Sequence, residues 1–139
     1  MTNEELIALL WNKDNNKAYA ALKEVEAASS CYYDYFEQGV KLLQSGKNLL
    51  IVRGARFIAS LALYDVDNKI DNILPLFFEA LASDKVTQVR QVLASLSKII
   101  KVKPALRQEI KEELSHYYYA SISDSSKSLI AKDILKIIG

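Results

Sequence analysis

The chain has 139 residues; half of them are hydrophobic, a quarter are charged, and the formal net charge is +1. This composition excludes an intrinsically disordered chain, and the length allows one domain with a real core but not two. With only 4 Gly and 2 Pro there is little material for hairpins or long loops, which favours helices.

Cysteine content and the N-terminus give an expectation about the compartment. Cys31 is the only cysteine, so an internal disulfide is excluded. The start of the chain lacks the basic and apolar regions of a signal peptide. Apolar runs such as 49–52 are far shorter than the roughly 20 residues that span a bilayer. We therefore expect a cytoplasmic protein with no membrane contact.

The first predicted helix pair covers residues 2–29. It opens with Thr2 and Glu5, which are spaced as a capping box, and residues 12–16 form a polar corner. The apolar residues on both sides of this corner have helical spacing. They are Leu6, Ile7, Leu9, Leu10, Ala18, Ala21, Leu22 and Val25.

The second predicted pair covers residues 31–64, starts in the aromatic cluster 32–36 and turns at residues 44–48. Gly46 can supply the left-handed residue that ends a helix. The run 49–52 alone is compatible with a strand. Helical spacing continues from it through Ala55 and Ile58, however, so we predict a helix there.

The third and fourth predicted pairs cover residues 67–102 and 104–138. The third contains Pro75 in its first helix and a polar corner at residues 83–88. The fourth begins at Pro104, a favourable first-turn residue, and its first helix is predicted to run as far as residues 117–119. Its corner is predicted at residues 121–125 and its last helix at residues 128–138.

A dipeptide repeat supports this division into pairs. Val52-Arg53 recurs as Val89-Arg90, 37 residues later, in the second helix of the next pair. A helix–corner–helix unit with a period of about 35 to 40 residues is typical of a helical solenoid. The sequence therefore predicts an all-α fold of about four antiparallel helix pairs in a single domain, residues 1–139.

The third pair resembles a HEAT repeat of the armadillo-like superfamily. Pro75, Asp84 and the Val89-Arg90 dipeptide follow the order of the HEAT consensus, while the second pair keeps only Val52-Arg53. The first and last pairs retain Asp14 and Asp124 as corner acids. The resemblance implies a right-handed α-α superhelix whose second helices line the concave surface.

The resemblance also implies a ladder between neighbouring repeats. In HEAT-like proteins the corner Asp and the second-helix Arg of successive repeats commonly pair. We therefore expect Arg53 to pair with Asp84 and Arg90 to pair with Asp124, mainly for a structural purpose.

No catalytic or metal site is indicated. Cys31 and His116 are the only residues of their types and fall in different pairs, so neither a Cys–His dyad nor a zinc site is expected. A calcium loop beginning at Asp65 would need Gly and Glu where the chain has Ile70 and Leu76. We expect no cofactor and no enzymatic activity.

Charge separates between the two sets of predicted helices. Basic residues predominate on the second helices and acidic residues on the first, so a neutral chain can present a basic groove. We expect a non-enzymatic interaction module or scaffold that binds a protein segment on its second-helix face. Nucleic acid is the alternative partner, and self-association through apolar terminal helices is a third possibility. The candidate partner-binding residues are Arg53, Arg56, Arg90, Lys98, Lys101 and Lys127.

Overall fold

The computed structural model describes all 139 residues and contains no strand, which confirms the all-α prediction. Its α-helices are α1 (Asn3–Ala8), α2 (Asn15–Ala27), α3 (Phe36–Leu43), α4 (Asn48–Ser60), α5 (Lys69–Ala80), α6 (Val86–Val102), α7 (Arg107–Ser115) and α8 (Asp124–Ile138). Short 3₁₀ turns connect several of them, among them η1 (Leu9–Trp11), η2 (Ser29–Cys31), η3 (Tyr33–Tyr35), η4 (Ala62–Tyr64), η5 (Pro104–Leu106) and η6 (Tyr119–Ser121).

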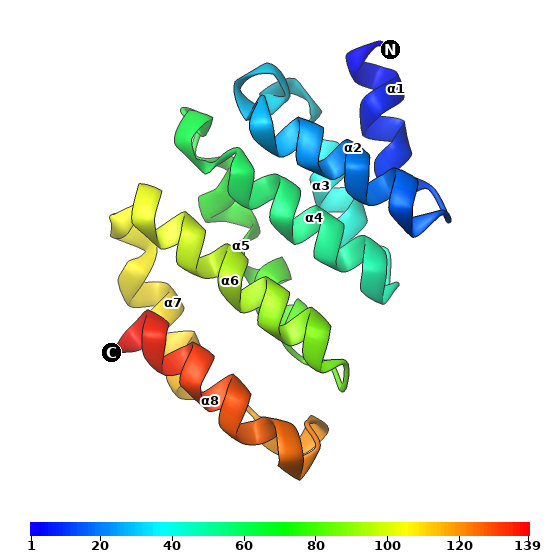
Figure 1. Cartoon of the computed structure of the whole chain (residues 1–139). Coiled ribbons are helices and arrows are strands. Elements are labelled where there is room, and N and C mark those ends of the chain that lie inside the picture. The colour runs from blue at the N-terminus through cyan, green and yellow to red at the C-terminus, as the bar shows by residue number, and fades with distance from the viewer.

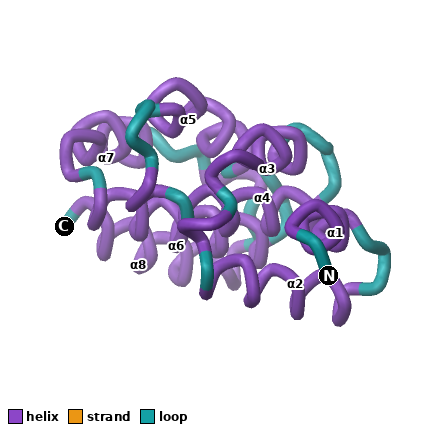
Figure 2. The backbone as a smooth tube through the Cα atoms, turned by 90° about the horizontal axis from the view of Figure 1, so that it is seen from above, coloured by secondary structure: helices purple, strands orange, loops and turns teal.

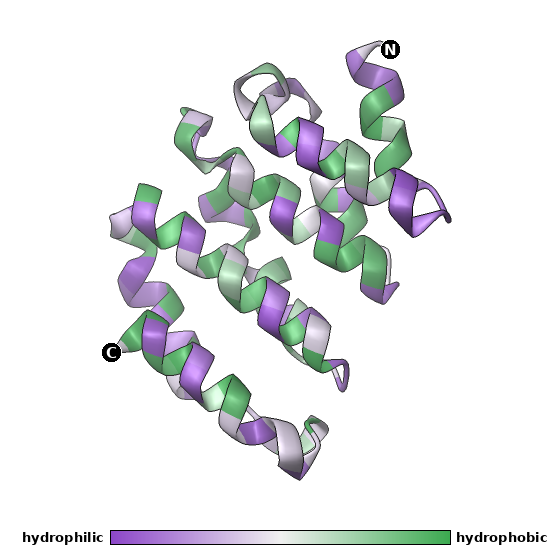
Figure 3. Ribbon diagram, viewed as in Figure 1, coloured by the Kyte–Doolittle hydropathy of each residue, from purple (hydrophilic) through white to green (hydrophobic).

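The helices form two layers. The even-numbered helices lie side by side in chain order, and α4 contacts both α2 and α6 while α6 also contacts α8 (Figure 1). The odd-numbered helices form the second layer behind them (Figure 2). Hydrophilic and hydrophobic bands alternate along each even-numbered helix, as expected when one side faces the other layer (Figure 3). One apolar cluster of 36 buried residues extends from Leu6 to Ile137, so the helices share a continuous core.

Local signals explain several helix ends. The Glu5 amide donates to Thr2 Oγ1 and the Thr2 amide donates to Glu5 Oε1, which confirms the predicted capping box. Asp14 Oδ1 accepts hydrogen bonds from the amides of Asn16 and Lys17 at the start of α2. Gly46 has a φ of 74°, as predicted for the end of α3.

The α-helix of the second pair begins at Phe36, the last residue of the aromatic segment 32–36, because residues 33–35 form the turn η3. Two predicted boundaries in the fourth pair are wrong. The first helix of the fourth pair ends at Ser115 and not at residues 117–119. The last helix begins at Asp124, four residues earlier than the predicted Ser128.

Helices α3 and α4 pack closely at two glycines, Gly39 of α3 and Gly54 of α4. A Cβ atom added to Gly54 would lie 2.8 Å from Leu42 Cβ and 2.9 Å from the carbonyl oxygen of Gly39. A Cβ atom added to Gly39 would lie 2.7 Å from Ile58 Cγ1. Gly54 therefore accepts only a hydrogen atom unless α3 moves, whereas a Cβ atom at Gly39 would require the side chains of Ile58 and Phe57 to shift.

Candidate functional site

The outward side of α2, α4, α6 and α8, here called the even-helix face, carries two shallow clefts that meet over α6. The cleft between α6 and α8 has a volume of about 660 Å³, and the cleft that reaches from α6 to α4 and α2 has a volume of about 450 Å³. Gln91 and Ala94 line both clefts, so the two are continuous. We call the charged lining of this continuous surface the basic track. It consists of Arg56, Arg90, Lys98, Lys101 and Lys136 with the carboxylates Glu26 and Asp133.

Arg56 is bound by a carboxylate of the neighbouring helix. Its Nη2 lies 2.7 Å from Glu26 Oε1 and its Nε lies 3.1 Å from Glu26 Oε2, which is a two-point contact between α4 and α2. Burial alone would lower the pKa of Arg56, but the hydrogen bonds and the negative charge of Glu26 raise it. The Arg56 fork is therefore already occupied.

Arg90 makes the equivalent contact between α6 and α8. Its Nε donates to Asp133 Oδ2 at 2.7 Å, and its Nη2 lies 3.4 Å from Asp133 Oδ1. The hydrogen bond to Asp133 and its negative charge raise the pKa of Arg90. Each arginine of the basic track thus ties two adjacent even-numbered helices together.

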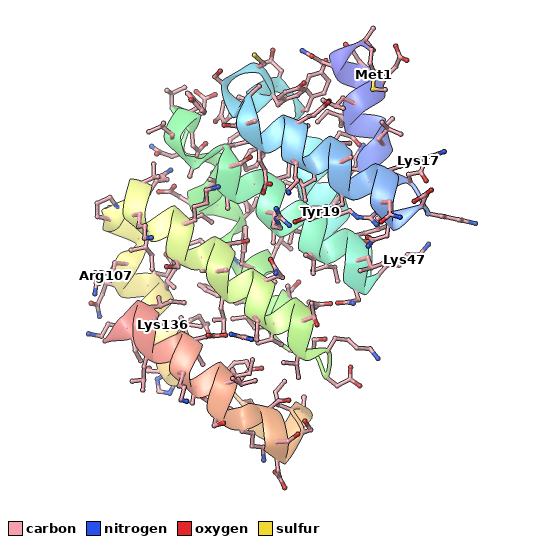
Figure 4. All side chains as sticks on the ribbon, in the orientation of Figure 1. Met1, Lys17, Tyr19, Lys47, Arg107 and Lys136 are labelled. Carbon is pink, nitrogen blue, oxygen red and sulfur yellow. The ribbon has the colours of Figure 1, made fainter.

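The three lysines of the basic track have no such partner. Lys98, Lys101 and Lys136 are exposed, and none of them forms an ion pair or a side-chain hydrogen bond. Figure 4 labels Lys136 on α8, on the side that faces α6. Since the two arginines are neutralised by Glu26 and Asp133, the positive charge of the track comes from these lysines.

An exposed aromatic ring lies beside the track. Tyr19 on α2 is 45% exposed, and both Arg56 Cζ and Lys23 Nζ lie 5.2 Å from the centre of its ring. Figure 4 shows Tyr19 between α2 and α4. The geometry is that of a cation–π contact, which holds the ring in place while leaving almost half of it open to solvent.

The prediction that Arg53 binds a partner or pairs with Asp84 is wrong. Arg53 is only 5% exposed and its guanidinium points back to the first corner. There it donates to the carbonyl oxygens of Leu10 at 2.9 Å and Asn12 at 3.1 Å, and to Asn15 Oδ1 at 3.1 Å. Burial lowers the pKa of Arg53. The side chain faces the preceding pair because α4 packs beside η1 and α2.

The other predicted ladder pairing, Arg90 with Asp124, is also wrong. Arg90 pairs with Asp133, and Asp124 pairs with Lys127 within the first turn of α8 at 2.9 Å. Asp84 is exposed and its carboxylate has no hydrogen-bond or ion-pair partner. Lys127 does not line either cleft, so of the predicted partner-binding residues the structure brings together only Arg56, Arg90, Lys98 and Lys101.

Sequence reasoning missed Lys136 and the two carboxylates. Lys136 belongs to the surplus of basic residues on the second helices, but within the last helix the 37-residue repeat points to Lys127 and not to Lys136. Asp124 and Asp133 are the two acidic residues of α8, and the sequence does not show which of them lies opposite Arg90. It likewise does not distinguish Glu26 from Glu24 as the partner of Arg56.

A second charged cluster lies at the corner before α5. Asp65 accepts hydrogen bonds from Tyr33 Oη at 2.6 Å, from Lys103 Nζ at 2.8 Å, and from the amides of Lys69 and Ile70 at 2.9 Å each. Lys103 Nζ also donates to Asn68 Oδ1 at 3.0 Å and to Asp71 Oδ1 at 2.5 Å. This cluster joins the segments before α3, before α5 and after α6.

The cluster shifts the pKa values of its members. Burial would raise the pKa of Asp65, but the hydrogen bonds from Lys103, Tyr33 and two backbone amides lower it. Burial and the contact with Asp65 raise the pKa of Tyr33 to about 12. The Lys103 amine forms ion pairs with both the Asp65 and the Asp71 carboxylates. No group of three or more His, Cys, Asp and Glu side chains is arranged around a possible metal position.

The comparisons with known proteins do not identify a family. No protein-family model, no curated protein and no solved structure matches this chain. Among its helices, none combines the length and the apolar character that crossing a membrane requires.

Proposed function

We propose that this protein is a non-enzymatic interaction module whose basic track binds an acidic segment of a partner protein. In this proposal the two helix layers form a short right-handed HEAT-like solenoid, the even-helix face is its concave side, and the protein works in the cytoplasm. The proposal requires no cofactor, because binding alone is its function.

The observation that supports this function is the set of three unpaired lysines along two joined clefts. An ammonium group is a compact point charge on a flexible stem, so lysines accommodate carboxylates at varied positions. Ala94 and Gln91 form the lining common to both clefts and carry no charge of their own. A peptide lying across α6 can therefore bring acidic side chains to Lys98 on one side and to Lys101 and Lys136 on the other.

Nucleic acid is the alternative ligand. Phosphates are attracted by the same charges, and Tyr19 offers an exposed ring beside two cations on which a base can stack. Both arginine forks are occupied by carboxylates, however, and bidentate arginine contacts are a main means of recognising phosphate. This favours an acidic protein segment.

Fluorescence anisotropy with three labelled probes tests the proposal. The probes are a Glu/Asp-rich peptide, a peptide of the same length with Gln and Asn instead, and duplex or single-stranded DNA. We expect the acidic peptide to bind and the neutral peptide not to bind. Affinity for the acidic peptide should fall as salt rises from about 50 to about 200 mM, because exposed charges are screened over about 10 Å.

A triple variant identifies the surface. Lys98→Gln, Lys101→Gln and Lys136→Gln together should weaken peptide binding at least about tenfold, since each exposed charge contributes up to about 1 kcal/mol. The matched control neutralises three exposed cations of the odd-numbered helices: Lys41→Gln, Arg107→Gln and Lys111→Gln. Equal losses in the two variants would contradict the proposal. DNA binding that is stronger than peptide binding and depends on Tyr19 would favour the alternative.

A further inference from the structure

The odd-numbered layer carries a groove of the opposite charge. The groove lies between α5 and α7 and has a volume of about 700 Å³. Glu79 of α5 and Glu109, Glu112 and Glu113 of α7 line it. None of these four carboxylates is paired with a Lys or Arg side chain. Glu109, Glu112 and Glu113 have i, i+3 and i+4 spacing, so α7 presents them on one side.

The two charged surfaces lie on opposite sides of the molecule. The basic track belongs to the even-numbered helices and the acidic groove to the odd-numbered layer behind them (Figure 2). The three unpaired lysines on one side thus carry a charge opposite to that of the four unpaired carboxylates on the other side. One copy of the chain carries both halves of a complementary contact but cannot bring them together itself.

We propose that the occupant of the basic track is a second copy of this chain, which binds through its acidic α5–α7 groove. The inference rests on the proposed function because it uses the same track and names one acidic partner for it. The contact joins two different surfaces, so it is heterologous: of two bound copies, one keeps its track free and the other keeps its groove free, and the assembly has one surface of each kind at its two ends. Such an assembly grows by addition of copies and does not stop at a symmetric dimer.

Sedimentation velocity over a wide concentration range tests this contact. At about 50 mM salt the weight-average molar mass of the wild-type protein should rise with concentration and exceed that of a dimer. At about 300 mM salt it should return towards the monomer, because the contact relies on exposed charges. A wild-type protein that stays monomeric at every concentration in low salt would overturn the inference.

Two complementary variants make the test specific. The track variant carries Lys98→Gln, Lys101→Gln and Lys136→Gln, and the groove variant carries Glu109→Gln, Glu112→Gln and Glu113→Gln. Each variant alone should remain monomeric. Their mixture should form a dimer that contains one of each and does not grow, because only one intact track and one intact groove can meet. Self-association of either variant to the wild-type extent would overturn the inference.

Peptide binding separates this inference from the proposed function. The groove variant keeps the track, so it should bind the acidic peptide as tightly as the wild-type protein does, which also shows that it is folded. Peptide binding without self-association supports the proposed function and refutes the second copy as the occupant. Self-association that passes the mixing test while the peptide does not bind supports the second copy and contradicts a general acidic partner.

Discussion

At the scale of single residues, Arg53 connects the first two helix pairs through three hydrogen bonds. Its guanidinium is buried and donates hydrogen bonds to the carbonyl oxygens of Leu10 and Asn12 and to Asn15 Oδ1. Arg53→Met would retain most of the volume but leave these acceptors without a donor. We expect the free energy of unfolding to fall by about 2–4 kcal/mol, measured by urea denaturation.

Arg56→Met is the matched control for this prediction. Arg56 is on the same helix and also binds a neighbouring element, but its side chain is 22% exposed and its partner is a carboxylate at the surface. Such a pair contributes up to about 1 kcal/mol. If the two variants lose the same stability, the hydrogen bonds of Arg53 to the first corner do not have the importance argued above.

The Asp65 cluster predicts a pH dependence at the alkaline end. The pKa of Tyr33 is about 12 in the folded protein, against 10.0 ordinarily. Between these values the unfolded chain has lost the phenolic proton while the folded protein retains it, so the free energy of unfolding falls as pH rises from about 10 to 12. Tyr33→Phe should reduce this fall, as measured by denaturant unfolding at several pH values.

Lys103 contributes to the pH dependence of the unfolding free energy that remains in the Tyr33→Phe variant. Burial lowers the pKa of Lys103, but Asp65 and Asp71 raise it to a larger extent, so Lys103 also contributes stability that is lost at high pH. Tyr118→Phe is the control, because Tyr118 is 76% exposed and makes no side-chain hydrogen bond. If Tyr118→Phe changes the pH dependence of the unfolding free energy as much as Tyr33→Phe does, the contact between Tyr33 and Asp65 is not its cause.

At the scale of helices, the close α3–α4 contact predicts that even a methyl group in place of a glycine hydrogen lowers the stability of the protein. Gly54→Ala should lower the free energy of unfolding by about 1–3 kcal/mol, although alanine is the better helix former, because its Cβ would meet the backbone of α3. Gly39→Ala should cost less, since its nearest neighbours are the side chains of Ile58 and Phe57, which can adjust. A thermal or urea denaturation series that reverses this order would refute the explanation.

The helices themselves could be predicted from sequence because their apolar residues repeat with a period near 3.6. Capping chemistry at Thr2 and Asp14 and the glycine at position 46 also act locally. The first residue of α3 and the last residue of α7 could not be predicted in this way. Tyr33, in the turn η3 just before α3, donates to Asp65, and Tyr117, two residues after α7, donates to the carbonyl oxygen of Leu81.

Prediction of the site was limited for a related reason. Charge surplus on alternate helices indicates a basic face, and it identifies Lys98 and Lys101 correctly as members of the basic track. It does not reveal which cations are already paired. The partners of Arg53, Arg56 and Arg90 lie 30 or more positions away, and they depend on how neighbouring helices are offset, which no local pattern encodes.

At the scale of the whole molecule, the layered packing predicts a gradient of local stability. α4 contacts helices on several sides, namely α2, α3, α5 and α6, whereas α1 and α8 lie at the ends of the array. We expect amide hydrogen exchange to be slowest in α4 and α6 and fastest in α1 and α8, because end elements lack a neighbour on one side. Uniform protection across all eight helices would instead indicate a single all-or-none opening.

The glycine contact between α3 and α4 also has a use in finding relatives. Gly39 and Gly54 are fixed by the distance between two helices and not by any partner, so they define the fold independently of what the protein binds. The same holds for Asp65 with Lys103, which join the segment before α5 to the segment after α6. A search pattern built from these four positions with their spacing, and leaving the surface lysines free to vary, would recover distant homologues that overall sequence similarity misses.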